Sequence, residues 1–338
     1  MVYGAIDLHT RRSEMRMIDG EGRVVREGRI ATAADGVVAA FAGVGPVRIL
    51  LEAGTESEWV ACTLEGAGYE VVVADPNYAP MYGDRQRRVK TDRRDVAALA
   101  EANRHGWFRR AYRRSAAQRA MQQRLTSRST LVQLRTKTIS VIRGLVRQAG
   151  GRIASGPAEA FPRRLAAAGV PATLQERLAP LRRTVEQLTA EILALDTVLE
   201  TAAEADPVVH QLQTVPGVGV IVALRFRAFI DTVARFGSAA QVSAAVGLVP
   251  REDSSAERRH RGHITKAGPS DLRSLLVQAA WACWRSRRHG PLGGWVDAVA
   301  RRRGRRIAVV ALARRLSRIL FAIWRDGTVF QPTGFAAA

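Results

Sequence analysis

Four acidic residues in the first third of the chain stand where predicted strands end or a predicted helix begins. Asp7 and Glu52 each end an apolar strand, while Asp92 and Asp95 open a helix and share one of its faces. Ligands gather beyond the carboxyl ends of neighbouring strands in an α/β sheet, so the four side chains can face one crevice. Converging carboxylates repel one another unless a hard cation lies between them, and oxygen ligands suit Mg²⁺ or Mn²⁺. The acids predict a two-ion phosphoryl-transfer site.

Each of these acids also has a structural interpretation. Asp7 can cap a turn after its strand, and Glu52 can be a surface acid at a strand end. Asp92 and Asp95 can satisfy the amides and dipole at the start of their helix. Both interpretations stay open for each residue alone, but their joint occurrence in a basic chain favours the metal site.

A second group that could do chemistry is a serine pair in a basic segment of the C-terminal third. This pair is Ser254 and Ser255. Serines in a polar loop are usually only turn residues, which is the structural alternative for both. The cations that follow them can hold a phosphodiester and stabilise the charge that develops when a hydroxyl attacks it. These cations are Arg258, Arg259, Arg261 and Lys266.

Two further features indicate contact with nucleic acid backbones. Gly217 and Gly219 form a Gly-x-Gly turn between predicted helices, similar to the hairpin of helix-hairpin-helix DNA-binding modules, whose amides bind phosphate. A turn that merely joins two packed helices is the alternative. A basic run near the C-terminus is suited to phosphate rather than to sequence reading. It comprises Arg301, Arg302, Arg303, Arg305 and Arg306.

The composition is that of a protein with real hydrophobic cores and a polyanionic partner. The chain has 338 residues, 47% of them hydrophobic, which is enough for two domains. Its net charge of +21, from 52 Lys+Arg against 31 Asp+Glu, favours nucleic acid. Cys62 and Cys283 lack the spacing of metal ligands and are expected in the core. No apolar run resembles a signal peptide or a spanning helix, so we expect a cytoplasmic protein.

The pattern of strands and helices positions the acids. Residues 2–8, 14–18 and 23–30 are predicted to form an antiparallel meander. Strands at 47–52 and 70–74 then alternate with helices, which are predicted over 34–42, 57–66 and 91–102. This order predicts an α/β domain with a mixed sheet over residues 1–112.

The rest of the chain is predicted to be mainly helical. Residues 113–205 are expected to form a coiled-coil arm that pairs with itself or with another subunit; an amphipathic helix on its own domain is the alternative. The second half of the arm carries apolar residues in four-three spacing: Leu174, Leu178, Leu181, Val185, Leu188, Ile192, Leu195 and Leu199. The first half is imperfect, with Arg128 and Arg135 on its heptad track. Residues 206–330 are predicted to form a C-terminal helical domain, followed by a tail over 331–338.

An ordered set of short motifs adds a family resemblance. The motifs are Ala5-Ile6-Asp7-Leu8-His9, Leu51-Glu52-Ala53, Lys90-Thr91-Asp92-Arg93-Arg94-Asp95, Pro216-Gly217-Val218-Gly219, Gly247-Leu248-Val249-Pro250, the serine pair, and Gly262-His263-Ile264-Thr265-Lys266-Ala267-Gly268. In this order they resemble the DEDD transposases of the insertion-sequence one-ten family, relatives of the site-specific pilin-gene invertase.

The resemblance implies a RuvC-like domain of RNase H fold, a coiled-coil arm and a C-terminal transposase domain. It implies that Asp7, Glu52, Asp92 and Asp95 bind Mg²⁺ and that a serine forms a phosphoserine link to DNA. Counting back from Gly262 places this nucleophile at Ser255, with Ser254 as the alternative. Family members are similar to recombinases guided by a noncoding bridge RNA that act as tetramers of two dimers.

The resulting hypothesis is a transposase that cuts and rejoins DNA through Ser255 with the help of Mg²⁺. A junction resolvase or nuclease that uses water is the first alternative. A basic RNA- or DNA-binding scaffold whose acids are helix caps is the second. An actin-like ATPase also begins with a strand that ends in Asp, but the Gly-rich phosphate loops it requires are missing here.

Overall fold

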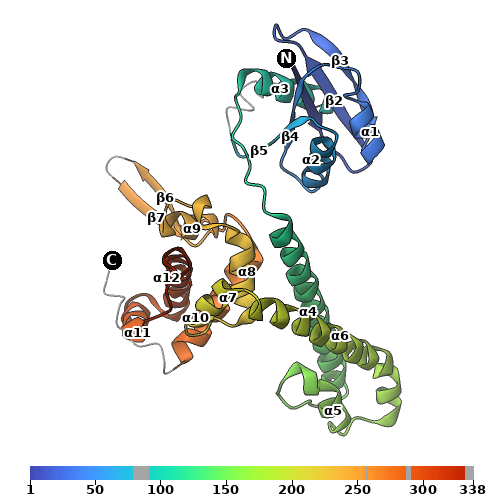
Figure 1. Ribbon diagram of the computed structural model, residues 1–338. Helices are drawn as coiled ribbons and strands as arrows, with labels where there is room; N and C mark the ends of the chain where they lie inside the picture. The colour runs from blue at the N-terminus through green and yellow to red at the C-terminus, as the bar shows by residue number, and fades with distance from the viewer. Residues whose placement is uncertain (79–90, 256–257, 287–290, 332–338) are drawn as a thin grey trace. The chain divides into compact units, whose positions relative to one another are not determined.

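The computed structural model describes residues 1–78, 91–255, 258–286 and 291–331 (Figure 1). Within these ranges, the side chains of residues 253–255, 258–261 and 291 lie outside the description. The chain divides into two compact units, Met1–Arg113 and Arg114–Ala338. The second unit contains both the helical arm and the C-terminal helices, and their separation into two domains stays a prediction. None of the described helices is both long and apolar enough to cross a membrane.

The first unit is built on a five-stranded mixed sheet in the order β3-β2-β1-β4-β5. Its strands are β1 (Val2–Asp7), β2 (Arg12–Ile18), β3 (Val24–Ala31), β4 (Val47–Glu52) and β5 (Glu70–Ala74). The strands β1, β2 and β3 pair antiparallel, whereas β1, β4 and β5 run parallel. The predicted mixed α/β sheet is therefore confirmed.

Helices cover both faces of this sheet, and the two-residue period of the strands decides which side chains each face receives. The helices α1 (Ala34–Ala39) and α2 (Ser57–Gly66) pack against the face that receives Ile6 and Leu51. Helix α3 (Asp92–His105) packs on the opposite face, against Ala5 and Leu50. Because alternate residues point to opposite faces, Asp7 and Glu52 belong to the face that α3 covers.

The second unit is helical apart from one hairpin. Its elements are α4 (Ala116–Gln148), the 3₁₀ turn η2 (Ala158–Ala160), α5 (Phe161–Ala166), α6 (Ala172–Glu204), α7 (Pro207–Gln213), α8 (Val220–Ile230), the 3₁₀ turn η3 (Val233–Arg235), α9 (Ala239–Ala245), β6 (Pro250–Ser255), β7 (Arg258–Ile264), α10 (Ser270–Arg285), α11 (Pro291–Arg303) and α12 (Arg305–Asp326). Elements from α7 onward share one large core, to which the near ends of α4 and α6 contribute Leu125 and Leu199.

The helices α4 and α6 pack against each other within the same chain (Figure 1). Apolar residues of α6 are buried at seven-residue intervals, at Leu178, Val185, Ile192 and Leu199. The two arginines of the α4 track meet polar partners: Arg128 forms an ion pair with Asp196 of α6, and Arg135 forms one of 3.0 Å with Glu159. The prediction of a coiled coil that joins subunits remains untested by this pairing.

Two expectations from the sequence were wrong. The serine-bearing segment is not a loop but the antiparallel hairpin β6–β7, because residues 250–255 are extended and pair with residues 258–264. Cys283 is buried in the core of the second unit as expected, whereas Cys62 is exposed on α2. An apolar sequence neighbourhood did not suffice to bury Cys62, since the packed face of α2 is formed by Val60, Ala61 and Leu64.

Candidate active site

The acids of the first unit gather at the carboxyl edge of the sheet because β1 and β4 are parallel neighbours. Ile6 of β1 is in register with Leu51 of β4, so the next residues, Asp7 and Glu52, end the two strands side by side. Both side chains belong to the face covered by α3. Two of the four acids therefore lie side by side at the carboxyl edge of the sheet, where ligands gather in α/β folds.

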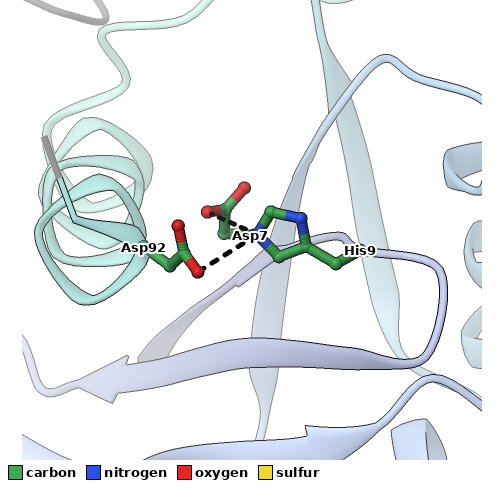
Figure 2. A group of neighbouring side chains, drawn as sticks. All are labelled: Asp7, His9 and Asp92. Atoms are coloured by element: carbon green, nitrogen blue, oxygen red, sulfur yellow. Dashed lines mark ion pairs between the residues drawn. The ribbon is translucent and has the colours of Figure 1, made fainter.

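Helix α3 brings the other two acids to the same place through its first turn. Asp92 and Asp95 follow Thr91, which is the N-cap residue and makes no capping bond with its side chain. Figure 2 shows the Asp92 carboxylate pointing toward Asp7 and His9 rather than back to its own helix. Single ligand atoms of Asp7, His9 and Asp92 all lie within 4.8 Å of one another.

The electrostatics of Asp7 report that all four acids converge. Burial raises the pKa of Asp7 above its ordinary value of 3.8, and His9 acts in the opposite direction. The negative charges of Asp95, Asp92 and Glu52 raise the pKa of Asp7 further. Three carboxylates are thus close enough to disfavour the charged form of a fourth, which is the situation that a bound cation relieves. The turn-cap interpretation of Asp7 does not account for this grouping.

A residue not singled out in the sequence holds α3 in position over the two strands. Asn103 is fully buried and donates hydrogen bonds of 2.8 Å to the Gly4 carbonyl of β1 and 2.7 Å to the Arg48 carbonyl of β4. Its own side-chain oxygen accepts a 2.8 Å bond from Arg48 Nε. One amide thereby ties α3 to both strands that carry site acids. The available signal was an Asn on the apolar face of a helix, seven residues after Val96.

His9 is the second residue that the sequence reasoning missed. It follows β1 by two residues, and its Nε2 lies 3.6 Å from an oxygen of Asp7 and 3.5 Å from an oxygen of Asp92. Its place so soon after a strand-ending acid was the signal that could have found it. The site therefore contains a nitrogen donor among its oxygen donors.

The predicted serine nucleophile belongs to the second unit. The backbone register of the hairpin places Ser255 opposite Arg258 and Ser254 opposite Arg259. The side chains of these four residues and of Arg261 lie outside the described part of the chain. Gly247 supports the base of the hairpin: its φ of +75° suits glycine, and a β-carbon there would overlap with the backbone of Ala267. Lys266, just after the hairpin, is exposed.

The glycines and arginines that were also predicted to contact nucleic acid differ in how much open space surrounds them. Gly217, with a φ of +85°, is pressed against the backbone of α10 at Ala279 and Cys283, whereas Gly219, the N-cap of α8, has open space around it. The glycine at 217 is thus required for packing, and the helix-hairpin-helix interpretation stays a prediction. All five arginines of the run from 301 to 306 are exposed. Arg301 and Arg305 border an open pocket with Trp284 and Asp297.

Charge is distributed very unevenly between the two units. Residues 1–113 hold 17 Lys+Arg and 16 Asp+Glu, a net charge of +1, whereas residues 114–338 hold 35 and 15, a net charge of +20. The acidic edge therefore lies in a nearly neutral unit, and the serine hairpin lies in a strongly basic one.

Comparison with known proteins identifies the family. Residues 5–150 match the DEDD transposase family, and residues 209–291 match the family described as "Transposase IS116/IS110/IS902 family". The chain is 30% identical over 318 residues to the transposase for insertion sequence element IS1111A of Coxiella burnetii, covering 90% of this chain and 85% of that protein. The chain belongs to the IS110 family of DEDD transposases. It is thus a DNA transposase, and the predicted family is confirmed.

Other relatives of this transposase agree. It is 29% identical over 302 residues to the "Probable family 20 transposase" of Pseudomonas aeruginosa, covering 86% of this chain and 88% of that one. The transposase for insertion sequence element IS1328 of Yersinia enterocolitica is 26% identical over 292 residues, or 85% and 86% of the two chains. The first matched family segment contains all four acids, and the second contains the serine pair.

A divalent metal, which the DEDD family implies, suits the residues present. Asp7 is half-buried and repelled by three other acids, and together the carboxylates offer the oxygen donors that a hard cation prefers. Such an ion offsets the like-charge repulsion that the folded chain otherwise carries at this edge.

Proposed function

We propose that this transposase cuts and rejoins DNA through a phosphoserine intermediate, with Ser255 as nucleophile and Ser254 as the alternative. The observation that carries the proposal is the placement of the acids: Asp7 and Glu52 end neighbouring parallel strands, and the first turn of α3, which carries Asp92 and Asp95, brings Asp92 beside Asp7. These acids occur in the order of the DEDD designation, inside the family segment that bears that name.

The four acids are assigned the role of holding Mg²⁺ or Mn²⁺. When bound, such an ion neutralises phosphate charge and stabilises the oxygen that leaves when the DNA strand is cut. The acids orient the ion, and Asn103 keeps α3 and both acid-bearing strands in register beneath it. The Ser255 oxygen, in the second unit, bonds to phosphorus while the bond from phosphorus to a bridging oxygen of the DNA strand breaks, and the serine proton passes to water. The cations at Arg258, Arg259, Arg261 and Lys266 bind the phosphodiester.

Most of the basic charge is assigned to nucleic acid backbones. The exposed arginines of the second unit support the assignment of its net charge of +20 to the binding of a polyanion. Gly217 and Gly219 are candidate contacts with phosphate. We further propose that a bridge RNA supplies target and donor choice by base pairing, and that subunits join as dimers and tetramers through the α4–α6 arm. Leu134 and Val141 of α4, 47% and 45% exposed, support an apolar contact on the arm.

Trapping the covalent intermediate tests the nucleophile. Purified transposase is incubated with its proposed bridge RNA, target and donor DNA and Mg²⁺, and the mixture is denatured and resolved on a gel. We expect an adduct with the wild type and with Ser254→Ala, and none with Ser255→Ala. Retention of the adduct in Ser255→Ala together with its loss in Ser254→Ala moves the nucleophile by one residue. Cleavage without an adduct in any variant supports a resolvase-like reaction with water.

Removing one acid tests the metal site. Asp7→Asn keeps the size of the side chain and removes its charge, so cleavage should fall about a thousandfold while DNA and RNA binding persists, because the ion supplies several kcal/mol to the transition state. Asp75→Asn is the matched control, since Asp75 follows β5 and pairs with Arg109 rather than with the acids. Full cleavage by Asp7→Asn contradicts the proposal.

A further inference from the structure

His9 lies at a point where its imidazole faces two of the site carboxylates. Its Nε2 is 3.6 Å from Asp7 Oδ2 and 3.5 Å from Asp92 Oδ2, as Figure 2 shows. Direct N–H···O hydrogen bonds are shorter, at about 2.7–3.2 Å. The imidazole therefore approaches both carboxylates without closing a hydrogen bond to either of them.

The spacing is close to that of groups that share one metal ion. Ligands about 2.1 Å from an ion and roughly 90–110° apart are separated by about 3.0–3.5 Å. One donor atom from each of Asp7, His9 and Asp92 lies within 4.8 Å of the other two, so the three atoms can surround a common centre. The same three residues do not form a hydrogen-bonded relay at these distances.

The backbone that carries His9 is held independently of the acids. Its amide donates a 3.1 Å hydrogen bond to Ser13 Oγ, and Ser13 is fully buried at the start of β2. The Ser13 hydroxyl also contacts the Thr32 hydroxyl at 2.7 Å, just beyond β3. The turn between β1 and β2 is thus anchored to the sheet, and His9 is presented to the acidic edge before any ligand arrives.

We propose that His9 is a nitrogen ligand of the metal site and that it shifts the preference of this transposase from Mg²⁺ toward Mn²⁺. This inference rests on the proposed function, because it assumes that the four acids hold an ion. Mg²⁺ and Mn²⁺ both suit carboxylate oxygens, but Mg²⁺ takes almost only oxygen donors, whereas Mn²⁺, as a first-row transition ion, accepts a nitrogen ligand among them more readily. The four acids alone offer only oxygen donors, which suit both Mg²⁺ and Mn²⁺.

Electron spin echo spectroscopy of bound Mn²⁺ tests the ligand directly. Full-length transposase is loaded with Mn²⁺, and nitrogen modulation is compared between samples with ordinary and ¹⁵N-labelled histidine. We expect nitrogen coupling in the wild type and its loss in His9→Ala. His105→Ala is the matched control, because His105 stacks on Trp107 in the same unit and should leave the signal unchanged.

Titration calorimetry supplies the second readout. His9→Ala should weaken Mn²⁺ binding by at least about tenfold and Mg²⁺ binding by much less. Mn²⁺ binding that requires Asp7 but shows no histidine coupling overturns the inference and leaves the proposed metal site intact. Absence of any ion binding that depends on Asp7 overturns both. Equal losses for the two ions in His9→Ala overturn the proposed selectivity.

Discussion

The two units of this transposase differ in the amount of charge they carry and in how that charge is distributed. The first unit is almost neutral, with a net charge of +1, and gathers four acids at one edge of its sheet. The second unit has a net charge of +20, spread over helices and a hairpin. A site for a small ion requires a few charges within a few ångströms, whereas a surface for a long polyanion requires many charges over a large area. The contrast agrees with the proposal that the first unit holds the metal ion, while the second carries the nucleophile and most of the contacts with nucleic acid.

Burial disfavours the charged form of individual side chains in both units. In the first, neighbouring acids and burial raise the pKa of Asp7. In the second, burial and then Arg114 lower the pKa of Arg225, which pairs with Asp271 of α10. Burial and then Arg318 lower the pKa of Arg315, which lies over the Trp295 ring. Each shift means that the folded protein disfavours the charged form of that group.

The largest effect expected in the second unit concerns shape rather than charge. Gly217→Ala should destabilise that unit by about 3 kcal/mol, because a β-carbon would overlap with the α10 backbone and φ is +85°. Gly219→Ala, in open space, should fold normally. Thermal unfolding of both variants checks this. If Gly219→Ala keeps the stability of the wild type but weakens DNA binding, the turn that contains Gly219 contacts phosphate.

An intermediate effect is expected from the arginines at the start of α12. A plot of log affinity for DNA against log salt concentration has a negative slope. Replacing Arg305 and Arg306 by Gln should reduce the magnitude of this slope by up to about 1.8, or about 0.9 for each phosphate that is no longer neutralised. Stability should not fall, since cations are disfavoured at a helix N-terminus. Arg325→Gln is the control, because Arg325 pairs with Asp326. An unchanged slope in the double variant would remove this run from the nucleic acid surface.

The smallest effect is on the stability of the metal-free first unit. Because the folded-state pKa of Asp7 lies above its ordinary 3.8, the stability that this group contributes falls as the pH rises above 3.8. In the presence of EDTA at pH 7, Asp7→Asn should therefore raise the melting temperature by about 1–3 °C. The gain should vanish below pH 3.8, where Asp7 is protonated in both states. A lower melting temperature at pH 7 would show that the charge of Asp7 stabilises the fold.

Local patterns in the sequence were enough to predict the elements of the first unit. Alternation and short apolar runs predicted the five strands, and the helix that opens at Asp92 was predicted within one residue of its start. These features depend on neighbours in the chain. The hairpin was missed because its strands are polar and basic, so neither periodicity nor apolar content marks residues 250–255 and 258–264 as extended.

The sequence by itself determined that acids end β1 and β4 and open α3, that the chain is strongly basic, and that its motifs resemble one transposase family. Only the tertiary structure decided that these acids converge, because α3 packs on the face to which Asp7 and Glu52 point. It also revealed Asn103 as the buried tie between α3 and the strands, and His9 as a neighbour of two carboxylates. Such contacts join residues as far as 99 positions apart, and no local pattern specifies them.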